Sequence, residues 1–224
     1  MMSSRARLVL FDLDGTLVHS APDIAHAANQ ALADVGHPLR PIAEICDFIG
    51  HGAERLIHRC LTGTRDDDAD SALHQTTYLG FQRHYAACLN AQTQLYAGVV
   101  ETLDTLAGHG ILLGCVTNKP AKFTLPLLER MALTPYFAVI LSGDSLPTKK
   151  PDPAPLRRAA ADCGVSNADT VMVGDSMADL TAARAASMRI FCVSYGYSAG
   201  IDLTGYKPDA YVAQIKDILP HLIG

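Results

Sequence analysis

Short runs of apolar residues alternate with longer segments of helical periodicity over most of the chain. The apolar run at 8–11 ends directly in an aspartate, which is typical of a strand buried on both faces of a sheet. Further short apolar runs lie at 111–116, 139–141, 170–173 and 190–193. The segments between the later runs have the Leu, Ala and Met spacing of helices, at 99–107, 121–131, 155–163 and 177–186. This alternation predicts an α/β fold with a parallel sheet and helices on both faces.

The stretch at 20–94 breaks the alternation, because it contains no convincing strand. Its first residues, Ser20-Ala21-Pro22-Asp23, resemble a capping box with proline in the first turn of a helix. The expected helices lie at 20–36, from 41 to a glycine break at 50–52, at 53–61 and at 66–90. Such a crossover is much longer than a usual connection between parallel strands. We therefore expect a core formed by 1–18 and 96–224 and an inserted helical domain at 19–95, hinged at its two neighbouring connections.

Composition narrows the class of protein. The chain has 224 residues, of which 49% are hydrophobic and 18% charged, so it can bury a core and is not a disordered polyanion. The net charge of −5 disfavours duplex nucleic acid as a partner. No apolar run reaches the ~18 residues that a membrane helix needs, and the run at 8–11 is too short for a signal peptide.

Six cysteines are spread along the chain without a C-x-x-C pair. This pattern is typical of reduced core thiols and not of a disulfide framework or a zinc cluster. We expect a cytoplasmic protein without a membrane partner, present as a monomer or a small homo-oligomer.

Polar and charged residues gather where the predicted strands end. In open parallel sheets, ligands bind at the carboxyl ends of the strands. The residues at these ends are Asp12, Asp14, Thr117, Asn118, Lys149, Lys150, Asp175 and Asp179. The sequence therefore predicts one site that draws on four separate loops.

Asp12 and Asp14 lie two residues apart, so in an extended chain both side chains point the same way. Gly15 then allows a turn whose free backbone amides face the same place and can bind substrate. An aspartate is ionised at neutral pH and can attack phosphorus without a general base. The second aspartate can transfer a proton if its surroundings raise its pKa. The alternative is a pair of solvated turn aspartates.

Asp175 and Asp179 add two carboxylates, at the end of a strand and in the first turn of the following helix. The alternative role for such residues is to complement the helix dipole. Four acids at one site repel one another unless a cation is bound. Ligands that are all oxygens favour Mg²⁺, which keeps water ligands and shares a substrate phosphate.

Thr117 and Asn118 offer a hydroxyl, an amide and backbone donors ahead of a helix, and Lys149 and Lys150 bring positive charge to the same edge. Each pair alone is equally typical of helix caps or surface lysines. Together with the carboxylates, they form a charge-balanced site for a phosphoryl group.

Four segments, in this order, resemble the four motifs of the haloacid dehalogenase superfamily. They are FDLDGTL at 11–17, VTN at 116–118, KP at 150–151 and VGDS at 173–176 with Asp179. Longer strings resemble the bacterial phosphoglycolate phosphatases of that superfamily, at 12–24, 149–155 and 194–197. The resemblance implies a Rossmann-like sheet with a helical cap inserted after the first motif.

The resemblance also implies roles for the matched residues. Asp12 would be the nucleophile that forms an aspartyl phosphate, and Asp14 would protonate the leaving alkoxide and then deprotonate the attacking water. Mg²⁺ would be held by the Asp12 carboxylate, the Asp14 backbone carbonyl and Asp175, with Asp179 as a further ligand or a support. The residues implied to bind the phosphoryl oxygens are Thr117, Asn118 and Lys150.

The cap is expected to select the substrate. The carboxylate of 2-phosphoglycolate needs a donor beyond the phosphate site. Gly50, His51 and Gly52 offer free amides at a helix start, and Arg55 offers a guanidinium one turn further on. The alternatives are a simple helix break at the glycines and an ordinary surface arginine.

The residue patterns together with this resemblance imply a magnesium-dependent phosphatase that hydrolyses 2-phosphoglycolate, a small phosphorylated metabolite. The first alternative is a phosphatase for another small ester, such as a sugar phosphate; a mutase or a dehalogenase fits less well. A non-catalytic phosphoryl receiver or a metal-binding regulator would share the acidic strand ends, but receivers are shorter and lack a helical insert. His19 and Ala97 stand where many relatives have Asp and Pro, and neither touches the expected chemistry.

Overall fold

The main sheet of the computed structural model, which describes residues 6–198 and 200–223, has six parallel strands in the order β5-β4-β1-β6-β7-β8. Their bounds are β1 Leu8–Phe11, β4 Leu112–Val116, β5 Val139–Leu141, β6 Thr170–Gly174, β7 Arg189–Val193 and β8 Ala210–Val212. This confirms the expected parallel α/β sheet and adds β8 at one edge. The expected core unit includes residues 1–5, 199 and 224, which lie outside the described residues.

Helices cover both faces of this sheet, and the side chains of β1 alternate between them. Leu8 and Leu10 pack in one apolar cluster, together with residues of α7 (Ala154–Asp162) and α8 (Met177–Ala185). Val9 and Phe11 pack in the other cluster. That second face is covered by α5 (Val99–Gly108), α6 (Ala121–Arg130) and α9 (Leu219–Ile223). Burial on both faces explains why β1 is a continuous apolar run and not an alternating one.

Short 3₁₀ helices occupy several of the connections, at η1 Thr134–Tyr136, η2 Asn167–Asp169, η3 Leu203–Tyr206 and η4 Ile215–Ile218. None of the helices among the described residues is both long and apolar enough to cross a membrane.

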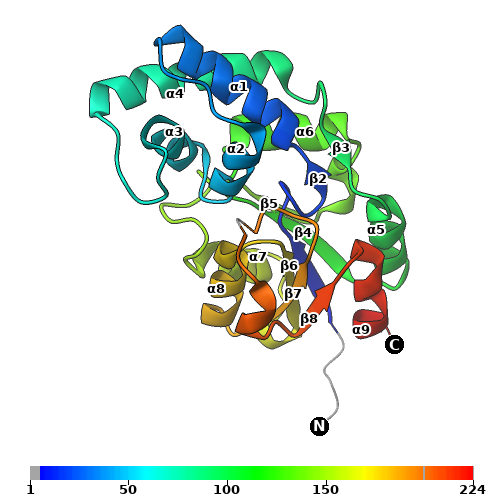
Figure 1. Ribbon diagram of the computed structural model, residues 1–224. Helices are drawn as coiled ribbons and strands as arrows, with labels where there is room; N and C mark the ends of the chain where they lie inside the picture. The colour runs from blue at the N-terminus through cyan, green and yellow to red at the C-terminus, as the bar shows by residue number, and fades with distance from the viewer. Residues whose placement is uncertain (1–5, 199, 224) are drawn as a thin grey trace.

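Four helices form the insertion, which lies above the main sheet in Figure 1. They are α1 Ala21–Asp34, α2 Ile42–Phe48, α3 Ala53–Thr62 and α4 Ser71–Cys88. The chain enters the insertion through β2 (Val18–His19) and leaves it through β3 (Gln94–Leu95), and these two strands pair antiparallel. The helical cap is therefore confirmed as part of the fold, and the boundaries at 18/19 and 95/96 stay a prediction.

Two local expectations about the insertion are wrong. The side chain of Ser20 makes no capping bond to α1; its hydroxyl donates to Asp14 Oδ1 at 2.5 Å. The helix expected from residue 66 begins instead at Ser71, because Asp70 accepts hydrogen bonds from the amides of the first turn and acts as the N-cap.

Asp23, the acidic residue of the expected capping box, connects the start of α1 to the segment before β3 through hydrogen bonds. Its fully buried carboxylate accepts hydrogen bonds from Gln92 N at 2.9 Å, from Thr93 N at 2.9 Å and from Thr93 Oγ1 at 2.6 Å. The two ends of the insertion are thereby joined by a charged acceptor.

We expect Asp23→Ala to lower the free energy of unfolding by about 3 kcal/mol, because donors around Thr93 lose their acceptor inside the protein. Chemical denaturation measures the change. Asp47→Ala, which removes an exposed carboxylate of α2, is the matched control and should change stability by less than about 0.5 kcal/mol. Equal effects of the two substitutions would contradict the role of Asp23.

Candidate active site

The sheet order places three of the expected site segments side by side. Asp12 follows β1, Thr117 follows β4 and Asp175 follows β6, and β1 pairs with both β4 and β6. All three residues are buried. The carboxyl ends of neighbouring parallel strands thus bring together residues that are more than 100 positions apart in the sequence.

Lys150 lies at the centre of this group. Its Nζ is 3.0 Å from Asp12 Oδ1 and donates to Asp179 Oδ1 at 2.6 Å and to the Val116 carbonyl at 2.7 Å. The ammonium thus donates two hydrogen bonds and is also ion-paired with Asp12. Burial by itself would lower the pKa of Lys150, but the charges of Asp12 and Asp179 raise it above the ordinary value. Lys150 therefore stays positively charged.

The buried carboxylates of Asp12, Asp175 and Asp179 each offer an oxygen within 4.8 Å of the others. Asp12 Oδ1 accepts no hydrogen bond from the residues that the structure describes, although it is ion-paired with Lys150. Burial raises the pKa of Asp12 to about 6, against the opposing effect of Lys150, and burial together with the charge of Asp179 raises the pKa of Asp175. Three acids held this closely with one ammonium fit a divalent cation.

The hydrogen bonds of the cluster distinguish its members. Asp179 Oδ2 accepts from Ser176 Oγ at 2.6 Å and Ser176 N at 3.1 Å in a capping box of α8, while its Oδ1 accepts from Lys150. Asp175 accepts one donor on each oxygen, Thr16 Oγ1 at 2.7 Å and Tyr197 N at 2.6 Å. Asp175 thus keeps more lone pairs for a cation than Asp179 does.

Gly15 has to be a glycine for this cluster to form. Its φ of +88° lies in the left-handed region, and a Cβ at this position would overlap the Asp175 carboxylate. The turn after Asp14 therefore fits directly against the acidic cluster.

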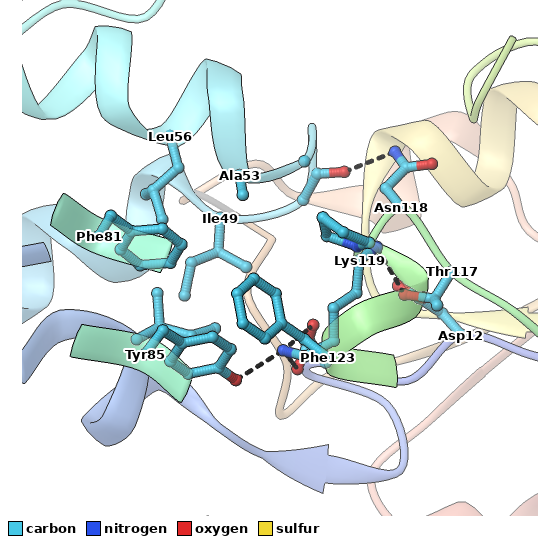
Figure 2. Close-up of a pocket in the computed structure, with 15 residues that line it drawn as sticks. Asp12, Ile49, Ala53, Leu56, Phe81, Tyr85, Thr117, Asn118, Lys119 and Phe123 are labelled. Carbon is cyan, nitrogen blue, oxygen red and sulfur yellow. Dashed lines mark hydrogen bonds and ion pairs between the residues drawn. The ribbon is translucent and has the colours of Figure 1, made fainter. Parts of the chain in front are cut away.

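A pocket lies between the strand ends and the insertion, and Figure 2 shows the side chains that face it from both sides. The core contributes Asp12, Asp14, Thr117, Asn118, Lys119, Pro120 and Phe123. The insertion contributes Ile24, Ile49, Gly50, Gly52, Ala53, Leu56, Phe81 and Tyr85. The floor of the pocket is therefore polar and its roof is largely apolar.

Asn118 joins the insertion to the core. Its Nδ2 donates to the Gly50 carbonyl at 2.9 Å and to the Lys150 carbonyl at 2.8 Å, so both amide hydrogens are engaged. Gly50 and Gly52 reach the pocket as expected. His51 contacts Arg59 Nη1 through its Nδ1 at 3.3 Å, and it does not line the pocket.

The structure does not bring Arg55 to the pocket. Its guanidinium donates to the Arg65 carbonyl at 2.7 Å and forms an ion pair with Asp68 at 2.5 Å. The side chain is engaged within the insertion, because the loop after α3 folds back over it. The structure thus places Arg55 away from the pocket in which it was expected to bind a substrate carboxylate.

Lys119 and Tyr85 are pocket residues that the sequence analysis missed. Lys119 Nζ lies 3.0 Å from each Asp14 carboxylate oxygen and donates to the hydroxyl of Tyr85 at 2.7 Å. Burial opposes the charge of Lys119, but Asp14 and Tyr85 raise its pKa above the ordinary value. The only signal in the sequence was the position of Lys119 directly after Asn118.

Comparisons with known proteins agree with this geometry. A family model described as haloacid dehalogenase-like hydrolase matches residues 9–193. A protein of Nitrosospira multiformis named phosphoglycolate phosphatase is 44% identical over 94% of this chain and 93% of its own length. One of the same name from Thiobacillus denitrificans is 42% identical over 94% of this chain and 93% of its own.

A solved structure has a closely similar fold. It is described as a predicted phosphoglycolate phosphatase from Haemophilus somnus 129pt, with a TM-score of 0.90 and 33% sequence identity. The match covers 99% of each chain. The insertion and the sheet are thus both included in the similarity.

We expect Mg²⁺ to stabilise the protein, and to do so more at about pH 7.5 than at about pH 5. The pKa of Asp12 is raised from 3.8 to about 6, so the folded state binds a proton more tightly than the unfolded chain does. This group therefore lowers the free energy of unfolding as the pH rises between about 4 and 6. A bound cation replaces the proton and removes this penalty above about pH 6. At the higher pH, thermal unfolding should show a rise in Tm of about 3–6 °C at ~10 mM Mg²⁺.

The matched variants test where the cation binds. Asp175→Asn should lose the Mg²⁺-dependent rise in Tm, whereas Asp67→Asn, which removes an exposed carboxylate of the insertion, should keep it. A rise of equal size at both pH values, or one that survives Asp175→Asn, would contradict the site.

Proposed function

This chain belongs to the haloacid dehalogenase-like hydrolase family, and from that membership we propose that it is a phosphatase that hydrolyses 2-phosphoglycolate to glycolate and phosphate. The observation that supports this most strongly is the cluster of Asp12, Lys150 and Asp175 at adjoining strand ends beneath a small pocket. The cluster combines a nucleophile, a fixed positive charge and a site for a cation, which are the parts that phosphoryl transfer needs.

The first step is proposed for Asp12 and Asp14. A carboxylate oxygen of Asp12 forms a bond to phosphorus, and the bond from phosphorus to the ester oxygen breaks. The protonated Asp14 carboxyl donates its proton to the departing alkoxide, which leaves as glycolate. Thr117 and the backbone amides beside it offer donors to the phosphoryl oxygens, and the ammonium of Lys150 supplies a fixed positive charge next to them.

The second step returns the enzyme to its starting state. Asp14 accepts a proton from a water molecule, whose oxygen bonds to phosphorus while the aspartyl phosphate bond breaks. Phosphate leaves, Asp12 is again a carboxylate and Asp14 again carries a proton. Ser20 and Lys119 hold the Asp14 carboxylate through hydrogen bonds of 2.5 and 3.0 Å, which fixes its position for both transfers.

We further propose Mg²⁺ as the cofactor, held by the Asp12 carboxylate, the Asp14 backbone carbonyl and Asp175, with Asp179 orienting Lys150 and the loop at Ser176. When bound, Mg²⁺ neutralises charge that develops on the phosphoryl group. The buried Asp12 Oδ1, which accepts no hydrogen bond from the described residues, supports this assignment.

The remaining proposals concern the cellular location, the partners and the oligomeric state of the protein. The six cysteines are free thiols and the net charge is −5, which support a reducing cytoplasm and a small metabolite, not nucleic acid, as the partner. We also propose that the chain acts as a monomer or a small homo-oligomer away from membranes.

We expect Asp12→Asn to lower kcat for 2-phosphoglycolate by at least about 1,000-fold, because the amide cannot form the acyl phosphate. Release of inorganic phosphate measures the loss, with Asp144→Asn, an exposed loop residue, as the matched control. A panel of phosphate esters that includes sugar phosphates, assayed with and without Mg²⁺, ranks the substrates. A sugar phosphate preferred tenfold in kcat/KM would overturn the choice of substrate, and full activity of Asp12→Asn would overturn the mechanism.

A further inference from the structure

We propose that Lys119 is the residue that selects the substrate, by binding the carboxylate of the leaving group in the pocket. This inference rests on the proposed phosphatase function and specifies which side chain recognises the part of the substrate that is not phosphate. It replaces Arg55, whose guanidinium is engaged by Arg65 and Asp68.

The first argument is the position of Lys119 relative to the reacting groups. With phosphorus at Asp12, the ester oxygen has to lie within hydrogen-bond reach of Asp14, which protonates it. Lys119 Nζ lies 3.0 Å from both oxygens of Asp14 and is therefore next to the leaving group. In 2-phosphoglycolate, one carbon separates the ester oxygen from the carboxylate, so the carboxylate comes within reach of this ammonium.

The second argument is that other cations near the pocket are committed or lie outside it. Among the described residues that line the pocket, Lys119 is the one with a positive charge. Lys150 is held by its ion pair with Asp12 and by its hydrogen bonds to Asp179 and the Val116 carbonyl. Lys149 does not line the pocket, although its Nζ lies 3.1 Å from the position that a Cβ on Gly52 would take.

The third argument is the environment of the ammonium. Lys119 is 7% exposed, and the aromatic ring of Tyr85 lies 4.6 Å from its Nζ. Phe81 and Phe123 form apolar walls around the same space, as Figure 2 shows. A charge pair shielded from water in this way is much stronger than one on the surface, so a single ammonium can distinguish a carboxylate from a neutral group.

The hydroxyl of Tyr85 provides the exchangeable partner. It accepts the third hydrogen bond of Lys119 at 2.7 Å, and it belongs to α4 of the insertion. A substrate carboxylate can take the place of this neutral acceptor while Lys119 keeps its contact with Asp14. Recognition of the carboxylate and the position of the cap are therefore linked through one side chain.

The experiment compares two substrates that differ in the carboxylate. The values of kcat/KM are measured for 2-phosphoglycolate and for 2-hydroxyethyl phosphate, which has a hydroxymethyl group in place of the carboxylate. In Lys119→Met we expect the ratio of the two values to fall by about 10- to 100-fold, the size of a lost charge-assisted hydrogen bond. Lys119→Arg should restore part of the ratio. Lys122→Met, which removes an exposed lysine of α6, is the matched control and should leave the ratio unchanged.

The ratio of the two kcat/KM values shows whether Lys119 binds the substrate carboxylate or only positions Asp14. Equal losses on both substrates would mean that Lys119 only positions Asp14, and unchanged values would mean that it does neither; both results overturn the proposal. A selective loss in Lys149→Met but not in Lys119→Met would also overturn it. If Lys119→Met does not fold, as judged by circular dichroism, Lys119→Gln provides the same comparison.

Assays of the wild-type protein on the two esters separate a failure of this inference from a failure of the proposed phosphatase function. If it hydrolyses neither ester, the proposed phosphatase function fails. If it hydrolyses both esters equally well, the phosphatase function stands and the selection of the carboxylate is overturned.

Discussion

The arrangement of the site depends on one buried charge, the ammonium of Lys150. It contacts the Asp12 carboxylate after β1, the Val116 carbonyl at the end of β4 and Asp179 in the first turn of α8. Three separate segments therefore share one centre, and removing one partner of such a buried group typically costs about 3–5 kcal/mol. The same contact that fixes the loops also holds the negative charges close enough together to bind a cation.

The family, the sheet and the grouping of several site residues could be predicted from the sequence, because they depend on local patterns. A fully buried strand has to be apolar throughout, and a parallel sheet collects polar residues at its carboxyl edge. Those two rules locate Asp12, Thr117 and Asp175, and the sheet order then brings them together. The family expected from the motifs is confirmed by the match over residues 9–193. The roles of the individual residues stay predictions.

The insertion was harder to predict, because its contacts join residues without a local signature. Arg55 has the chemistry to bind an anion, but a carbonyl at Arg65 and the Asp68 carboxylate engage it. Lys119 looked like an ordinary lysine near a helix start, and only the packing of α4 brings Tyr85 against it. Likewise, Asp23 matched a helix cap by spacing, but its carboxylate bonds to a segment 70 residues away. Helical periodicity specifies which face is apolar and does not specify the partner of each polar group.

The antiparallel pair of β2 and β3 has a consequence for how such a protein diversifies. Val18 pairs with Leu95, so the two connections of the helical insertion lie side by side and the insertion interrupts no pairing of the main sheet. Mutations in the helices can then reshape the roof over the leaving group while the strand ends keep their geometry. Under the proposed function, changes around Tyr85 would alter which substrate is bound while the residues proposed for the reaction stay the same.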